Sequence, residues 1–512
     1  MQNYRNAAAP AFFRNHKTNC ITKTETSFAM KHSFTFTIRL AALALIATMA
    51  TIHTAALILP QQIGDNMVLQ QKTRAALWGW AKPKSTVKVK CSWTTTPVSA
   101  TADSKGRWLA KVPTVEGNYN PQTITIEGDK QTINLHNVLI GEVWFASGQS
   151  NMEMTIGGYP AQPVEGSDTI TAFASEYSNK IRMATLALSA TNLAADSVAG
   201  AWKVCNPENV SKFSAVGYFF AETLNRLLDV PVGIIACSWG GSYVEGWLPE
   251  EAAEAFPEID DNFKSVLAAQ GHSVSKLFNG MVSPLRNYTI RGFLWNQGES
   301  NASSDWCKYY AIHFSAMLQA WRNAFNQGDL PMYCVEIPGW RYDGNNLLMG
   351  AFGREEQWKG ADMSDKCEMV SVIDCMHPDQ SDDIHGSMKR PVGERLAFMA
   401  AAKTYGLKNM PCNYSRFTKA DFNGNTATLH FTNAANGFTP HDALVGFEVA
   451  GADKRFYPAT ATEVWQTGDI TVTSPKVKEI KAVRYCFKNW VIGKIYNSQW
   501  LPLVPFRTDN WD

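Results

Sequence analysis

The chain has 512 residues, and its 47 Lys and Arg balance 46 Asp and Glu to a formal net charge of +1. This balance excludes the broad basic surface with which proteins grip nucleic acid or an anionic membrane. Hydrophobic residues make up 45% and charged residues 18%, which is typical of a globular protein and excludes a disordered or fibrous chain. At roughly 150 residues per domain, the length predicts about two to four domains.

The beginning of the chain has the features of an export signal. A positively charged stretch that starts at Met30 precedes an apolar run, Leu40 to Met49, which is shorter than a membrane-spanning helix. The small residues Thr54 to Ala56 suit a signal peptidase, so we expect residues 1–56 to be a leader, with its true start at Met30 and cleavage after Ala56. An uncleaved helical anchor is the alternative. The mature protein is therefore expected to be periplasmic or secreted, without a membrane span.

The spacing of the cysteines does not indicate a metal site. They are scattered, with no C-x-x-C pair and no His/Cys cluster at ligand spacing, which disfavours zinc. Loss of the leader with Cys20 leaves nine, so at least one thiol would stay free or pair outside the chain. We expect neither a metal nor an organic cofactor.

Residues 57–137 predict a small β-sandwich domain. Short alternating runs such as Val87–Cys91, Trp108–Val112 and Thr123–Gly128 are separated by turn residues. Residues 411–512 return to short strands, for example Thr426–Phe431 and Leu444–Val449, and predict a β-rich C-terminal domain.

Residues 138–410 between them predict an α/β domain with a mainly parallel sheet. Apolar runs typical of buried parallel strands occur at Val232–Ser238, Gly292–Trp295 and Met332–Ile337. They alternate with segments of helical spacing, Tyr218–Leu228 and Ala311–Phe325. This region is expected to carry the chemistry, because ligands of such sheets bind at the carboxyl ends of the strands.

The most informative motif lies at the end of a strand-like run, in Ser147-Gly148-Gln149-Ser150-Asn151. Glycine permits a sharp turn there, and the turn would lift the Ser150 hydroxyl to the carboxyl end of the sheet. The motif is not the G-x-S-x-G elbow, because Met152 replaces the second glycine. A serine that only caps a helix is the alternative.

Three further segments complete a hydrolytic pattern. Paired glycines, Gly240 and Gly241, follow a strand and let backbone N–H groups approach an oxyanion. Trp295 to Asn301 offers the Gln297 amide as a further donor at another strand end. Asp382-Asp-Ile-His385 places an aspartate three residues before a histidine, as in a Ser-His-Asp triad.

Together these blocks resemble those of the bacterial sialate O-acetylesterase family, whose members are SGNH-like hydrolases. The resembling blocks are G-Q-S-N-M, S-W-G-G, W-x-Q-G-E-S-N and D-I-H, and the likeness extends from Asn66-Met-Val-Leu-Gln70 to Pro505-Phe-Arg-Thr-Asp509. The resemblance implies a flavodoxin-like, three-layer α/β catalytic domain.

The resemblance also implies roles for individual residues. Ser150 would be the nucleophile and His385 the base, with the Ser150 N–H, Gly241 and Gln297 as the oxyanion hole and Glu299 as a support. Asp382 would be the third triad member. The alternatives to Asp382 are Asp383, Asp374 or no carboxylate at all, and His377 competes with His385.

The expected function is removal of O-acetyl groups from carbohydrates through an acetyl-enzyme. The resemblance places acetylated sialic acids first, and an esterase of acetylxylan or another glycan is the alternative. A non-catalytic glycan-binding protein on an SGNH scaffold is the alternative of another class.

Overall fold

The computed structural model describes residues 56–511, except 270, 272 and 343–347. The predicted leader, apart from Ala56, lies outside these residues. The central feature is a sheet with the strand order β13-β12-β11-β7-β10-β8-β9. All neighbouring strands in it are parallel except β9, which is antiparallel to β8. The strands are β7 (Gln131–Gly148), β8 (Ile181–Thr185), β9 (Trp202–Val204), β10 (Val232–Ser238), β11 (Gly292–Asn296), β12 (Met332–Val335) and β13 (Cys367–Val370).

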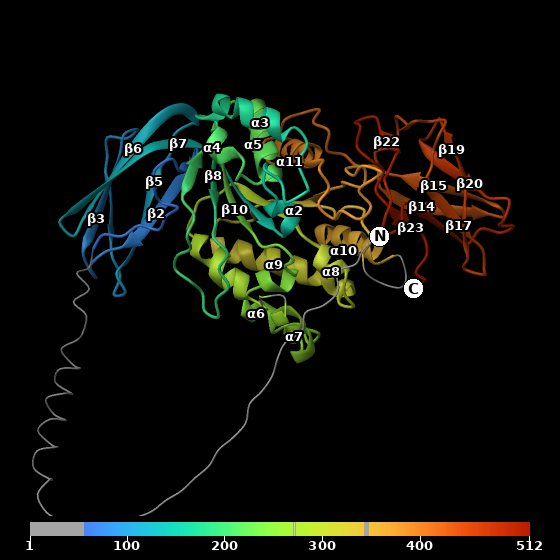
Figure 1. Ribbon diagram of the computed structural model, residues 1–512, viewed down its shortest axis with the longest axis horizontal. Helices are drawn as coiled ribbons and strands as arrows, with labels where there is room; N and C mark the ends of the chain where they lie inside the picture. Colours follow the sequence, from blue (N-terminus) through green and yellow to red (C-terminus); the bar gives the residue numbers. More distant parts are fainter. Residues whose placement is uncertain (1–55, 270, 272, 343–347, 512) are drawn as a thin grey trace, which may run out of the picture. The chain divides into compact units, whose positions relative to one another are not determined.

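Helices cover both faces of this sheet, as Figure 1 shows. On one face α5 (Ala215–Leu228) packs against α11 (Lys389–Lys403), and on the other α9 (Tyr310–Phe325) packs against α10 (Met349–Asp362). Helix α5 begins where the Ser214 side chain accepts the Gly217 N–H, and nearly all of it is buried. The shorter helices are α2 (Ser150–Glu153), α3 (Ser167–Phe173), α4 (Pro207–Val210), α6 (Glu250–Ala253), α7 (Asp261–Ala269) and α8 (Glu299–Ala302). The predicted three-layer α/β fold is therefore confirmed.

The order of the strands places a crossing point at β7. The chain leaves β7 toward β8 and β10 on one side and then returns to build β11, β12 and β13 on the other. In open parallel sheets, such a reversal opens a crevice at the carboxyl ends of the central strands. The residues that follow β7, β10 and β11 meet there.

Residues before β7 form the predicted alternating strands. They are β1 (Val68–Gln70), β2 (Arg74–Trp80), β3 (Thr86–Cys91), β4 (Val98–Thr101), β5 (Arg107–Pro113) and β6 (Asn118–Gly128). Strands β2 and β5 form a ribbon, and β3, β4, β6 and β1 join the sheet that contains β7. In β5 every second side chain is buried, as expected of a strand with one face on a core.

The boundary predicted between residues 137 and 138 falls inside β7. The first part of this strand pairs with β6, and its last part pairs with β10 and β11. One hydrophobic core also runs from Leu57 through the catalytic region. The division into domains stays a prediction.

After α11 the chain forms short antiparallel strands with a second hydrophobic core, built around residues such as Leu429, Val449 and Ile470. These strands are β14 (Phe417–Asn423), β15 (Thr426–Phe431), β16 (Phe438–Thr439), β17 (Phe447–Ala450), β18 (Phe456–Pro458), β19 (Thr460–Val464), β20 (Asp469–Thr473), β21 (Ala482–Tyr485), β22 (Tyr496–Asn497) and β23 (Phe506–Arg507). The β-rich character of the C-terminal region is thus confirmed.

Among the described residues, no helix has the length and apolar character to cross a membrane. All nine cysteines in this part of the chain are buried and free of disulfide bonds. Burial raises the pKa of thiols such as Cys91, to about 12, because a thiolate would be desolvated.

Candidate active site

The turn that carries Ser150 is fixed by its backbone. Strand β7 ends at Gly148, whose φ is 139°, and a Cβ at this position would lie 2.0 Å from the Asn296 carbonyl oxygen. The next N–H, of Gln149, donates to the same carbonyl at 2.9 Å. Only glycine permits this approach of β7 to β11, and Ser150 therefore emerges half-buried as the first residue of α2.

Gly240 lies beside Ser150 at the end of β10. A Cβ built on Gly240 would lie 3.6 Å from the Ser150 Cβ and 3.0 Å from the Glu153 Oε2. Gly241 follows with a φ of 72°, and both glycines line the same pocket as Ser150. The Gly240 N–H is hydrogen-bonded to the Glu153 carboxylate, so the Gly241 N–H is the donor of this pair that could face an oxyanion next to Ser150.

Gln297, which the sequence predicts as an oxyanion donor, does not line the pocket that contains Ser150. Its side chain is fully buried, and its Nε2 donates to the Ser242 carbonyl at 2.9 Å and to Asn301 Oδ1 at 2.8 Å. An amide NH2 has two hydrogens, and these two bonds use both of them. Gln297 therefore anchors the loop after β10 through the Ser242 carbonyl.

His385 lies in the segment between β13 and α11 and reaches the pocket of Ser150. Its Nδ1 is 3.0 Å from Gln162 Oε1, and its ring contacts the Tyr159 ring edge to face at a centroid distance of 5.0 Å. The Tyr159 hydroxyl in turn donates to the Ser150 carbonyl at 3.1 Å. The segment around Tyr159 and Gln162 thus contacts both the serine and the histidine.

Asp382, predicted as the triad carboxylate, pairs with a guanidinium rather than with the histidine. Its side chain is 74% exposed and pairs with Arg341 at 3.0 Å. Asp374, whose side chain is 8% exposed, forms a bidentate ion pair with Arg395, at 2.7 Å for both oxygens. Neither is placed to orient the imidazole, because each carboxylate already has a guanidinium partner elsewhere.

Asp383 is the aspartate that the structure places next to His385. Its Oδ1 accepts the backbone N–H of His385 at 2.8 Å and the Gln162 Nε2 at 2.8 Å. It therefore contacts the histidine segment without touching the ring. His377 faces Glu165 and does not line the pocket.

Asn151 links the two segments that carry the serine and the histidine. Its Nδ2 donates to Glu299 Oε1 at 2.6 Å and to the Ile384 carbonyl at 3.1 Å, and its Oδ1 accepts from Lys389 Nζ at 2.6 Å. All three polar side chains are buried. Glu299 thus contacts Asn151, the neighbour of Ser150, and its supporting role stays a prediction.

The charges around the pocket follow from burial. Burial lowers the pKa of His385, and the Lys389 ammonium lowers it further, while Asp383 opposes them. Burial also raises the pKa of Glu299 and of Glu153, and it lowers the pKa of Lys389 to about 8. A histidine with a lowered pKa is neutral near pH 7 and can accept a proton.

Sequence reasoning missed Gln162, Tyr159, Asn151 and Lys389. Asn151 stands in the Gly-Gln-Ser-Asn block, so its position next to the nucleophile was a usable signal. The other three lie in segments without a motif. Their contribution depends on contacts between residues far apart in the chain, such as the 223 positions that separate Gln162 from His385.

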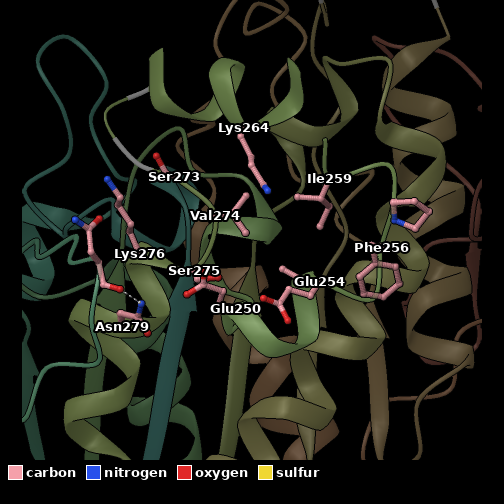
Figure 2. Close-up of a pocket in the computed structure, with 13 residues that line it drawn as sticks. Glu250, Glu254, Phe256, Ile259, Lys264, Ser273, Val274, Ser275, Lys276 and Asn279 are labelled. Carbon is pink, nitrogen blue, oxygen red and sulfur yellow. Dashed lines mark hydrogen bonds between the residues drawn. The ribbon is translucent and has the colours of Figure 1, made fainter. Parts of the chain in front are cut away.

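The pocket that contains Ser150 and His385 has a volume of about 750 Å³. Figure 2 shows another pocket, of about 680 Å³, which is lined mostly by residues between 250 and 279, among them Glu254, Lys264 and Lys276. None of the residues predicted for catalysis lines this second pocket. Within the described part of the chain, no group of three His, Cys, Asp or Glu side chains is arranged to hold a metal ion.

Comparison with known proteins shows the family to which the chain belongs. Residues 140–402 match the family model described as carbohydrate esterase, sialic acid-specific acetylesterase. The sialate O-acetylesterase of Pongo abelii is 31% identical over 87% of this chain and 91% of its own, and that of Rattus norvegicus is 26% identical over 87% and 93%.

A solved structure is similar over most of the chain. The crystal structure of a carbohydrate acetylesterase from Xanthomonas citri has 30% sequence identity and a TM-score of 0.79, and the match covers 89% of this chain and 100% of that one. The family match spans the strands and loops that carry Ser150, Gly240 and His385. The chain therefore belongs to the carbohydrate esterase family of sialic acid-specific acetylesterases and is a carboxylic ester hydrolase.

Proposed function

We propose that the protein is an exported carbohydrate O-acetylesterase in which Ser150 is the nucleophile and His385 the general base. The observation that carries the proposal is that both side chains line one pocket, next to the backbone of Gly240 and Gly241, in a chain of an esterase family. A glycan-binding protein without catalysis has no need of a serine, a histidine and N–H donors in one place.

In the proposed reaction, the Ser150 Oγ attacks the acetyl carbonyl carbon while its proton passes to His385 Nε2. Nε2 is the ring nitrogen left for this step, because Nδ1 faces Gln162. The negative oxygen of the tetrahedral intermediate is stabilised by the backbone N–H groups of Ser150 and Gly241. The sugar hydroxyl leaves with the proton from His385, and an acetyl-enzyme remains.

Water completes the proposed cycle. His385 takes a proton from the water as it attacks the acetyl-enzyme, and acetate leaves as Ser150 regains its proton. The lowered pKa of His385 keeps the imidazole in the neutral form that this step requires. No step draws on a metal or an organic cofactor.

For the substrate, acetylated sialic acids come first, because the mammalian relatives are named sialate O-acetylesterases. An acetylated neutral glycan, such as acetylxylan, is the second candidate, and the charge of the pocket favours it. Of the described residues that line the pocket, Glu153 and Glu299 are acidic and none is Lys or Arg. Arg341 does not line the pocket and is paired with Asp382.

A matched pair of substrates separates these candidates. Acetate release is measured from an O-acetylated N-acetylneuraminic acid, from the methyl ester of the same sugar, and from acetylated xylan, with Ser150→Ala as the blank. A sialate esterase should prefer the free acid to its methyl ester. A preference for the methyl ester and xylan would assign the enzyme to neutral glycans, and no acetate above the blank would contradict the proposed function.

Export is the part of the proposal that concerns residues outside the described part of the chain. It is supported by the charged stretch from Met30 and the apolar run Leu40–Met49. Expression of the full chain in a cell with a secretory pathway, followed by N-terminal sequencing, should give a mature protein that starts at Leu57. Retention of residue 30 in the exported protein would support an uncleaved anchor instead.

A further inference from the structure

The side chain that contacts the far nitrogen of the His385 ring is an amide. Gln162 Oε1 lies 3.0 Å from His385 Nδ1, and Gln162 Nε2 donates to Asp383 Oδ1 at 2.8 Å. The same Asp383 oxygen accepts the backbone N–H of His385 at 2.8 Å. The three residues therefore form a closed loop of hydrogen bonds around the imidazole.

The direction of every bond in this loop is fixed by chemistry. An ionised carboxylate only accepts hydrogen bonds, so Asp383 can only face the NH2 end of Gln162. The carbonyl end of the amide must then face the ring. A carbonyl oxygen also only accepts, so the neutral imidazole carries its hydrogen on Nδ1 and its lone pair on Nε2.

We propose that Gln162, oriented by Asp383, is the positioning residue of this active site and takes the place that a carboxylate has in a Ser-His-Asp triad. The inference rests on the proposed function, in which His385 acts through Nε2. Asp383 thus selects the tautomer of the His385 ring without contacting the ring. The aspartate of the Asp-Ile-His motif acts on the histidine through the Gln162 amide.

A neutral partner has a consequence that a carboxylate would not have. A carboxylate on Nδ1 stabilises the imidazolium ion and raises the histidine pKa, whereas a carbonyl oxygen does so far less. The charged and titratable groups around His385 are Lys389, Asp383, the pocket acids Glu153 and Glu299, Tyr159, and the Arg341–Asp382 pair. Burial and the Lys389 ammonium account for the lowered pKa of His385, which Asp383 only partly offsets.

Four variants test the relay, with p-nitrophenyl acetate as the substrate and with kcat, KM and the pH dependence of kcat/KM as readouts. Gln162→Leu keeps the bulk but removes both hydrogen bonds, and we expect kcat to fall about a hundredfold with KM nearly unchanged, because the imidazole loses its orientation. The double variant Gln162→Glu/Asp383→Asn places a carboxylate on Nδ1, and the amide at position 383 supplies an N–H to its second oxygen, which in the single variant would meet the Asp383 carboxylate. The acidic limb of the double variant should move to higher pH, with activity recovered on the alkaline side.

The adjacent aspartates supply the matched control. Asp383→Asn presents an NH2 that can turn the Gln162 amide around, so kcat should fall at least tenfold, whereas Asp382→Asn should leave kcat and the pH profile as in the wild type. Equal losses in these two variants would overturn the relay. An unmoved acidic limb in the double variant Gln162→Glu/Asp383→Asn would also overturn it, and this readout decides the matter if Gln162→Leu does not fold. Wild-type activity no higher than that of Ser150→Ala would instead contradict the proposed function.

Discussion

Ser150 and His385 reach the same pocket from segments that are built in different ways. Ser150 follows a buried strand at the centre of the sheet, and the backbone contact between Gly148 and Asn296 fixes its turn. His385 lies between β13 and α11 in a segment without helix or strand. Its position depends on side chains, above all Gln162, Asp383 and Asn151.

This difference indicates how each half of the site should respond to change. A residue held by backbone packing tolerates loss of a neighbouring side chain but not a new Cβ. A residue held by side-chain hydrogen bonds loses its geometry in steps as those bonds are removed. The predictions below test this contrast, from the largest expected effect to the smallest.

Ser150→Ala should lower kcat by about five to six orders of magnitude, the scale expected when a serine nucleophile is removed. Because the turn is fixed by the backbone, the melting temperature should stay close to that of the wild type. Ser300→Ala, at another serine of the same pocket, is the matched control and should keep kcat within about tenfold. Activity of Ser150→Ala within about threefold of the wild type, roughly 0.65 kcal/mol in barrier, would exclude Ser150 as the nucleophile.

His385→Ala should lower kcat by about four orders of magnitude, while His377→Ala, at a histidine outside the pocket, should change it little. In the wild type, the base form of His385 is required, and its pKa lies below the usual value of about 6.5. Activity should therefore be lost only as the pH falls below that value. A reversed order of the two histidine variants would contradict the assignment of the base.

Asn151→Leu should affect activity and stability together. It removes the anchor of the Ile384 carbonyl next to His385, so kcat should fall about ten- to a hundredfold. It also leaves Glu299 and Lys389 buried without this partner, which should lower the free energy of unfolding by about 3 kcal/mol. Urea unfolding and steady-state kinetics measure the two effects, and an unchanged kcat would show that Asn151 does not link the two segments.

Gln297→Ala should have the smallest catalytic effect. Loss of an oxyanion donor lowers kcat about a hundred- to a thousandfold, but the structure directs both amide hydrogens of Gln297 to the protein. We therefore expect kcat to fall less than about tenfold, with a loss of about 1–3 kcal/mol in stability. Gly240→Ala should lower kcat more, because its Cβ would stand next to Ser150. A larger loss of kcat in Gln297→Ala than in Gly240→Ala would assign Gln297 as an oxyanion donor.

Much of the fold follows from the sequence because local patterns determine it. The strand predicted at Val232–Ser238 has these bounds in the structure, and the predicted helices lie within α5 and α9. The motifs after β7, β10 and β11 meet at one edge of the sheet for the same reason, since parallel strands end together. Spacing alone could place the Ser150 and His385 segments, but not the partners of their side chains.

The choice of the aspartate that orients His385 shows why the rest of the site could not be predicted from the sequence. A separation of three residues favoured Asp382, yet this segment is not helical, and Asp383 instead accepts the N–H of His385 two residues on. The ring is contacted from a third segment, by Gln162, which belongs to no motif. In the same way, Gln297 lies where predicted at a strand end, but the contacts with Ser242 and Asn301 determine where its hydrogens point.

The passage of β7 from the N-terminal strands into the central sheet has a consequence for cooperative unfolding. A fragment that starts at residue 138 would begin within this 18-residue strand and would lose β6, the antiparallel neighbour of its first part. It would also lose β1, which pairs with Leu139, Ile140 and Gly141. Since the N-terminal strands and the catalytic sheet share one hydrophobic core, they should melt in a single calorimetric transition, and the shortened fragment should be recovered only as aggregate.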